Sequence, residues 1–130
     1  MSESLPEAEL EVLARLQEVG EAQASEIRQR LQPLRPLSHA SVMTLLGRLQ
    51  AKGLVTRRKA EVGKAFVFSP TRKAREAYRD VVGRLLERVF ANDPVALVSS
   101  LFGAKQPTAE ELARLEALVE RLHEEEDEEA

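Results

Sequence analysis

The order in which hydrophobic periodicity changes along the chain is the feature that most restricts its fold. Apolar residues recur at helical spacing over residues 10–19, 27–31 and 42–49, and the pattern then shifts to short runs at 55–59 and 65–69. A turn at residues 60–64 separates these runs, and Pro70 ends the second one, which is typical of a β-hairpin. Three helices followed by a hairpin predict a winged helix-turn-helix domain over residues 1–70, with a small third strand at residues 22–24.

The rest of the chain is predicted to be helical, so the fold class is mostly α with a small β-hairpin. Helical patterns over residues 71–90, 95–102 and 108–123 leave more apolar side chains than one small domain can cover. We therefore expect residues 71–123 to form a helical dimerisation region, and the acidic residues 124–130 to form a disordered tail. The expected dimer contacts are Tyr78, Val82, Leu85, Leu86, Val89, Phe90, Leu97, Leu101, Leu112, Leu115, Val119 and Leu122.

Basic residues are concentrated in one part of the chain. Between residues 28 and 79 there are 13 Lys and Arg residues against Glu61 and Glu76, a net charge of +11, although the whole chain carries −3. A basic block of this kind inside a folded segment is typical of a protein that binds a polyanion. A solvated, arginine-rich surface is the alternative interpretation.

The third helical pattern carries most of the functional information. Four of its apolar residues, at positions 42, 45, 46 and 49, share one face and should point to the core. The opposite face, which we call the reading face, is small and nearly uncharged and consists of Ala40, Met43, Thr44, Gly47 and Ala51. A mid-helix glycine costs about 1 kcal/mol relative to alanine, so this face is expected to approach another surface closely. A DNA groove is the interpretation we favour, and a tolerant surface or a helix–helix contact is the alternative.

The predicted DNA contacts lie on this helix and on the hairpin. Thr44 offers a methyl group and a hydroxyl to base edges, while hydroxyl and cationic groups at the rim would bind phosphates. The Lys and Arg side chains of the hairpin would contact the phosphate backbone of the DNA beside the groove. A charged edge strand that blocks aggregation is the alternative for the hairpin, but it does not explain why the charges share one sign. The full predicted set is Ser38, His39, Ala40, Ser41, Met43, Thr44, Arg48, Lys52, Arg57, Arg58, Lys59 and Lys64.

Three ordered motifs resemble the penicillinase-repressor family, the BlaI/MecI/CopY group. They are Leu5-Pro6-Glu7-Ala8-Glu9-Leu10-Glu11-Val12-Leu13, the run from Ser38 to Leu54, and Gly63-Lys64-Ala65-Phe66-Val67-Phe68-Ser69-Pro70. The likeness covers residues 5–70 and continues more loosely to about Leu122. It implies a homodimeric repressor on a palindromic, double-stranded DNA operator, with base contacts at Ser41 and Thr44. It also adds an upstream sensor protein to the candidate partners.

The chain departs from the family pattern in places that concern regulation and specificity. His39-Ala40 replaces the usual Pro-Lys after the capping serine, which removes a contact cation. Ser99-Ser100 stands where classical members have the Asn-Phe pair that a sensor protease cuts. The chain has no cysteine, so the copper–thiolate sensing of one branch of the family is excluded.

Several function classes are not supported by any motif. We find no nucleophile–histidine–acid set, glycine-rich phosphate loop or metalloprotease motif, so the chain is not expected to be an enzyme. We expect neither a metal site nor a cofactor, and no stretch approaches the ~20 apolar residues of a membrane span. The start lacks the pattern of a signal peptide, which favours a cytoplasmic, nucleoid-associated protein. A winged-helix scaffold that binds proteins without reading DNA is the alternative function.

Overall fold

The computed structural model describes residues 5–129, which fall into two compact units divided between Gly83 and Arg84. The elements, in chain order, are α1 (Glu7–Val19), β1 (Ala22–Gln23), α2 (Ala24–Leu31), α3 (His39–Ala51), β2 (Val55–Lys59), β3 (Phe66–Pro70), α4 (Arg72–Phe90), α5 (Pro94–Ala104) and α6 (Ala109–Glu129).

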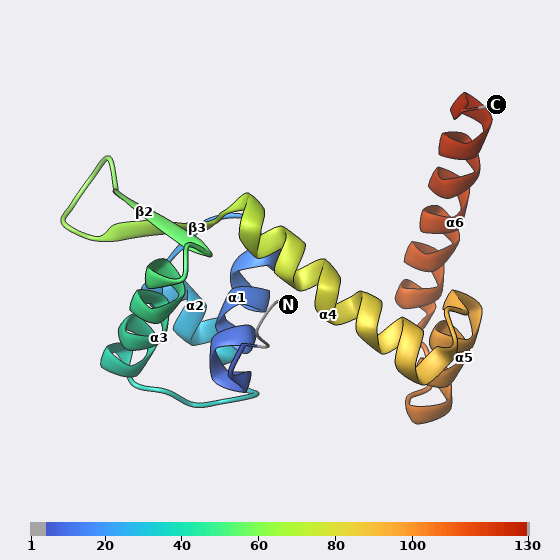
Figure 1. Cartoon of the computed structure of the whole chain (residues 1–130), viewed down its shortest axis with the longest axis horizontal. Coiled ribbons are helices and arrows are strands. Elements are labelled where there is room, and N and C mark those ends of the chain that lie inside the picture. The colour runs from blue at the N-terminus through green and yellow to red at the C-terminus, as the bar shows by residue number, and fades with distance from the viewer. Residues whose placement is uncertain (1–4, 130) are drawn as a thin grey trace. The chain divides into compact units, whose positions relative to one another are not determined.

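The first unit is a three-helix cluster packed against a small antiparallel sheet (Figure 1). The sheet has the order β1-β3-β2, so the second hairpin strand is central and pairs with the short strand β1 through Ala22 and Phe68. The core consists of aliphatic side chains from α1, α2 and α3 together with Phe68, and its fully buried members include Val12, Leu13, Leu16, Ile27, Leu31, Val42, Leu46 and Leu49. The predicted winged helix, including its third strand, is confirmed.

Local sequence signals fix both ends of α3. The Ser38 hydroxyl accepts a hydrogen bond from the Ser41 amide at 3.1 Å, which caps the N-terminus. Gly53 adopts a φ of +76°, a conformation that favours glycine, and the chain reverses there into β2. The Thr71 hydroxyl donates to the Gly53 carbonyl at 2.7 Å and accepts from the Ala74 amide at 3.2 Å. The start of α4 is thereby tied to the end of α3.

The first unit ends within α4, at Gly83. The first unit extends to Gly83 because the opening turns of α4 belong to its core. Ala74 is fully buried there and Ala77 packs against the same cluster. The amphipathic pattern of α4 is continuous, so nothing in the sequence marks the change.

Helix ends in the second unit are also locally specified. The Asp93 carboxylate, directly before Pro94, accepts hydrogen bonds from the Val95 and Ala96 amides at 3.0 and 3.2 Å and caps α5. Thr108 and Glu111 form a reciprocal capping box at the start of α6. Helix α5 continues one residue past Gly103 to Ala104, and Ser99 and Ser100 lie exposed within it.

The Glu111 carboxylate is held by two hydrogen bonds at the start of α6. It accepts a hydrogen bond from the Lys105 ammonium at 2.8 Å and one from the Thr108 amide at 3.0 Å. The hydrogen bond from Lys105 is the largest cause of a lowered pKa at Glu111, and the bond from Thr108 adds to it. Together they lower the pKa of Glu111 from its ordinary value of 4.5 to about 2.

None of the described residues from 84 to 129 is fully buried. Each predicted dimer contact lies on a helix, with the first six on α4, Leu97 and Leu101 on α5, and the last four on α6. Large apolar side chains stay exposed along these helices, and the most exposed are Val89, Val95 and Leu101. Residues 124–129 continue α6 instead of forming the expected disordered tail, since glutamate is a good helix former.

Candidate nucleic-acid interface

The structure places the predicted DNA contacts on α3 and on the wing, the segment from Val55 to Pro70 that comprises β2, the turn and β3. Ser38 caps α3, residues 39–48 of the set lie on α3, and Lys52 ends it. Arg57, Arg58 and Lys59 lie on β2, and Lys64 lies in the turn before β3. Both elements belong to the first unit, so their side chains can act on one partner.

Helix α3 buries one face and exposes the reading face, as the sequence predicted. Val42, Leu46 and Leu49 are fully buried against α1 and α2. Of the reading face, Ala40, Thr44, Gly47 and Ala51 are exposed and Met43 is partly buried. The exposed strip has no charged side chain along its centre, so it can approach the edges of bases without stripping water from a charge.

Gly47 is not required by packing within the first unit. A Cβ at this position would meet no heavy atom within 4 Å, and its backbone lies within a regular helix. Glycine destabilises a helix interior, and no packing contact within the first unit compensates for that loss at Gly47. What it leaves is open space on the reading face, where a partner surface could come close to the backbone of α3.

The hydroxyl groups of α3 are held by local hydrogen bonds. The Thr44 hydroxyl donates to the Ala40 carbonyl at 3.0 Å, and the Ser38 hydroxyl donates to that of Ser41, also at 3.0 Å. These bonds fix the side-chain rotamers while leaving acceptor lone pairs and the Thr44 methyl group exposed. Such groups can contact base edges and the thymine methyl group in a major groove.

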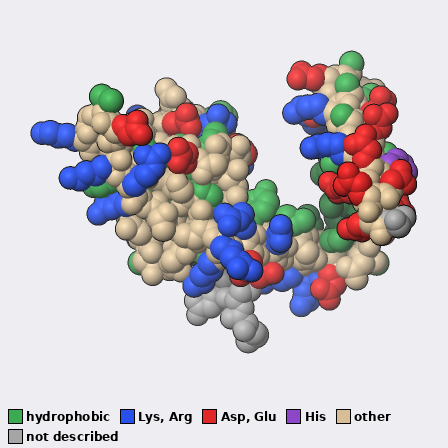
Figure 2. Space-filling view, turned by 90° about the horizontal axis from the view of Figure 1, so that it is seen from above, with side chains coloured by type: hydrophobic (Ala, Val, Ile, Leu, Met, Phe, Trp, Pro, Cys, Tyr) green, Lys and Arg blue, Asp and Glu red, His purple; other side chains and the backbone are tan. Residues whose placement is uncertain are grey.

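The cations of the wing are held in different ways. The Arg57 guanidinium stacks over the Phe66 ring, 4.3 Å from its centroid, and Arg58 forms an ion pair with Glu21 at 3.0 Å. Lys59 and Lys64 have no ion-pair partner in the part of the chain that the structure describes. Figure 2 shows Lys and Arg side chains projecting from the wing, and acidic side chains gathered along α6.

Lys52, one of the predicted DNA contacts, forms an ion pair within the first unit. Its ammonium lies 2.6 Å from the Glu9 carboxylate on α1, and Glu9 is only 2% exposed. Lys52 therefore neutralises a buried acid and ties the end of α3 to α1. The Lys73 ammonium donates to the Lys52 carbonyl at 3.0 Å and helps to satisfy this helix end.

The sequence count of +11 overstates the free positive charge because α1 supplies compensating acids. Besides the pair at Lys52, the Arg35 guanidinium donates a hydrogen bond to Glu11 at 2.9 Å, and this bond and the carboxylate charge raise the pKa of Arg35.

The sequence did not predict Glu9 as the partner of Lys52 at the end of α3. The available signal was an acid in register with the apolar stripe of α1, three residues before Val12 and four before Leu13.

Other kinds of site are not found in the described chain. Residues 5–129 contain no group of three or more His, Cys, Asp or Glu side chains arranged to hold a metal ion. No helix among those residues is long and apolar enough to cross a membrane.

A three-helix unit with a small sheet, an exposed, nearly uncharged helix face and a basic wing is typical of winged-helix DNA-binding proteins. Within this class, the family described as Penicillinase repressor matches residues 5–121, and the chain belongs to that family. It is thus a DNA-binding transcriptional regulator and not an enzyme. No curated protein gives a significant match.

Solved structures of low sequence identity support the fold. A mutant of MarR from E. coli, in complex with operator DNA, has a TM-score of 0.59 at 20% identity over 91% of this chain and 75% of its own. YusO from Bacillus subtilis has a TM-score of 0.56 at 21% identity over 92% and 75%. A mutant of ZitR from Lactococcus lactis has a TM-score of 0.56 at 20% identity over 93% and 75%.

Proposed function

We propose that the chain is a sequence-specific transcriptional repressor that binds a palindromic operator as a homodimer. The observation that carries the proposal is the reading face of α3, which is exposed, small and uncharged along its centre, and which has cations beside it. An ordinary solvent-facing helix surface carries Glu, Lys and Gln, and a protein-docking face would carry a large apolar patch. This face fits the floor of a major groove better than either.

Each group near the groove has an assigned part. Ser41 and Thr44 contact base edges, with Ala40, Met43 and Gly47 allowing the close approach. Arg48, Arg57, Lys59 and Lys64 contact phosphates and supply affinity that depends on salt. Ser38 and His39, at the N-terminus of α3, lie where a helix end binds a phosphate. Arg58 contributes less because Glu21 already pairs with it, and Lys52 acts by holding α3 in place.

The homodimer is supported by the apolar side chains that neither unit covers. Tyr78 and Val82 on α4 are about half exposed, and so are Leu112, Val119 and Leu122 on α6. Exposed apolar residues in this number favour a partner surface, and a two-fold related copy is the commonest solution. Two reading faces would then address half-sites about one turn of DNA apart, roughly 34–36 Å. We place the protein in the cytoplasm, on the nucleoid, where a sensor protein could control it.

The proposal is tested by selecting duplexes from a random pool with the full chain and footprinting the enriched sequence. We expect a palindrome whose half-site centres are separated by about 10 base pairs, and protection of both half-sites at one dimer per duplex. Enrichment of an asymmetric site bound by one chain would overturn the homodimer on a palindrome. Failure to enrich any sequence would overturn sequence-specific repression and would favour the scaffold function.

A further inference from the structure

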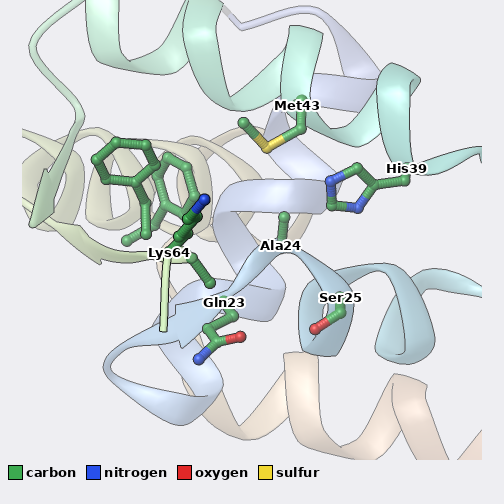
Figure 3. Close-up of a pocket in the computed structure, with 9 residues that line it drawn as sticks. Gln23, Ala24, Ser25, His39, Met43 and Lys64 are labelled. Atoms are coloured by element: carbon green, nitrogen blue, oxygen red, sulfur yellow. The ribbon is translucent and has the colours of Figure 1, made fainter. Parts of the chain in front are cut away.

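A hollow of about 310 Å³ lies in the first unit between the start of α2, the first two turns of α3 and the wing. We call it the α2–α3–wing pocket. Figure 3 shows His39 and Met43 lining it from α3 and Lys64 from the wing, while Gln23 at the end of β1 and Ser25 at the start of α2 border it. Its volume is at the lower end of the range for small-molecule pockets, roughly 300–1,000 Å³.

The polar groups around this pocket favour an anion. No acidic side chain lines it, and Lys64 brings a positive charge. Within residues 5–129, the side chains of Gln23, Ser25, His39 and Lys64 have no hydrogen-bond partner. Helix α2 begins at the pocket, and Gln23 makes no side-chain cap. Free amide groups and the positive helix end therefore add to the Lys64 charge.

The remaining lining is apolar. Met43 lines the pocket from α3 and Phe66 from β3, and both are partly buried against the core. A bare inorganic anion would leave this surface in contact with water, whereas an apolar ring would cover it and gain hydrophobic free energy. The two halves of the lining thus call for one ligand that has a charged end and an apolar body.

We propose that the α2–α3–wing pocket binds a small organic monoanion, such as an aromatic carboxylate, with its charged group near Lys64 and the start of α2. Its apolar body lies against Met43 and Phe66. This site is built from the first unit alone and does not depend on the proposed function.

The ligand would also regulate DNA binding, and this step rests on the proposed function. His39, Met43 and Lys64 line the pocket and also belong to the predicted DNA contacts. An occupied pocket withdraws the Lys64 charge from the phosphates and places a second anion beside them. Binding of the carboxylate and of DNA must then weaken each other by the same factor.

The binding step is tested without DNA by titrating the full chain with 1-naphthoate and recording calorimetry and amide NMR shifts. We expect one site per chain with a dissociation constant of about 1 mM or below, and shifts concentrated at residues 23–25, 39–43 and 64–66. The neutral 1-naphthamide and inorganic phosphate should each bind about tenfold more weakly or worse. Equal binding of phosphate would overturn the apolar half of the site, and shifts centred on α5 and α6 would overturn its location.

Two variants separate the site from general charge effects. Lys64→Gln should weaken 1-naphthoate by about tenfold and leave 1-naphthamide unchanged, since only the charged ligand uses the ammonium. Arg75→Gln, which removes an exposed cation of α4 outside the pocket, should change neither. Equal losses in both variants would show a nonspecific effect of net charge and overturn the site.

A last titration measures the coupling and keeps the two proposals distinguishable. Saturating 1-naphthoate should weaken duplex DNA binding, and DNA should weaken 1-naphthoate by the same factor. If 1-naphthoate binds and DNA affinity does not change, the regulatory step is overturned while the site stands. If DNA shifts the amide resonances of residues 23–25 and 1-naphthoate does not, the anion that binds in the pocket is a phosphate of the DNA backbone. That result would overturn the small-molecule site.

Discussion

The ion pair between Lys52 and Glu9 allows a sharp test of how α3 is held. Lys52→Met removes the ammonium but keeps most of the aliphatic chain, so the Glu9 carboxylate is left buried without its partner. The two ends of the pair differ in solvent access, because the side chain of Lys52 is 42% exposed and that of Glu9 only 3%. Water can replace Glu9 around the ammonium, but it cannot readily replace Lys52 around the carboxylate.

This asymmetry sets the expected magnitudes. Removing one partner of a fully buried pair costs about 3–5 kcal/mol, and the partial exposure of Lys52 places Lys52→Met near the lower limit, at about 3 kcal/mol. Glu9→Gln keeps the shape and leaves a solvated ammonium, so it should cost about 1 kcal/mol. The double variant should be more stable than the sum of the two single losses predicts, by about 2 kcal/mol.

Urea unfolding at pH 7 and one fixed protein concentration measures all four proteins. A Lys52→Met variant that is as stable as the unchanged chain, or that loses no more than Glu9→Gln, would refute the assigned role of the pair. DNA titrations add an independent readout. Because Glu9 already compensates its charge, Lys52→Met should leave the slope of log K against log salt unchanged when the protein is folded.

Three further results are expected. Lys64→Gln should lower the salt slope of DNA binding by about 0.9, and Arg58→Gln by less because of its ion pair; equal slopes in all proteins would remove the wing from the interface. Leu85→Asp combined with Leu115→Asp should convert a sedimenting dimer into a monomer and remove most operator affinity, whereas an unchanged chain that is monomeric at micromolar concentration would contradict the dimer. The Glu111 carboxylate has a lowered pKa, so its stabilisation of α6 should be complete above about pH 4.5 and lost as the pH falls toward 2. The helical circular dichroism of the chain and of Glu111→Gln should therefore converge over that range, and a difference independent of pH would count against the capping box.

Much of the fold could be predicted from the sequence because its signals are local. The capping serine at residue 38, the glycine at 53 and the proline at 70 each act on the backbone within a few residues, and all three mark element ends in the structure. The period of the apolar residues in α3 separates the buried face from the reading face without reference to any other element. The same reasoning located the exposed hydroxyl groups at positions 41 and 44.

What the sequence did not predict depends on neighbours that are distant along the chain. Lys52 and Glu9 are 43 residues apart, and only the packing of α3 on α1 brings them together. Arg35 likewise forms an ion pair with Glu11, and Arg58 forms one with Glu21. A count of charges within a window therefore includes cations that are already compensated. The extension of the first unit into α4 has no sequence signal for a related reason, because burial of the small Ala74 side chain leaves no pattern.

The central claim is that the reading face of α3 recognises base sequence, and Thr44→Ala tests it most directly. Affinity is measured for the selected operator and for a random duplex of equal length and in the same salt, with Thr44→Ser as a control that keeps the hydroxyl. We expect Thr44→Ala to lose roughly 1–3 kcal/mol on the operator and much less on random DNA. Equal losses on the two duplexes would contradict the claim, because they would show that α3 contacts DNA without reading it.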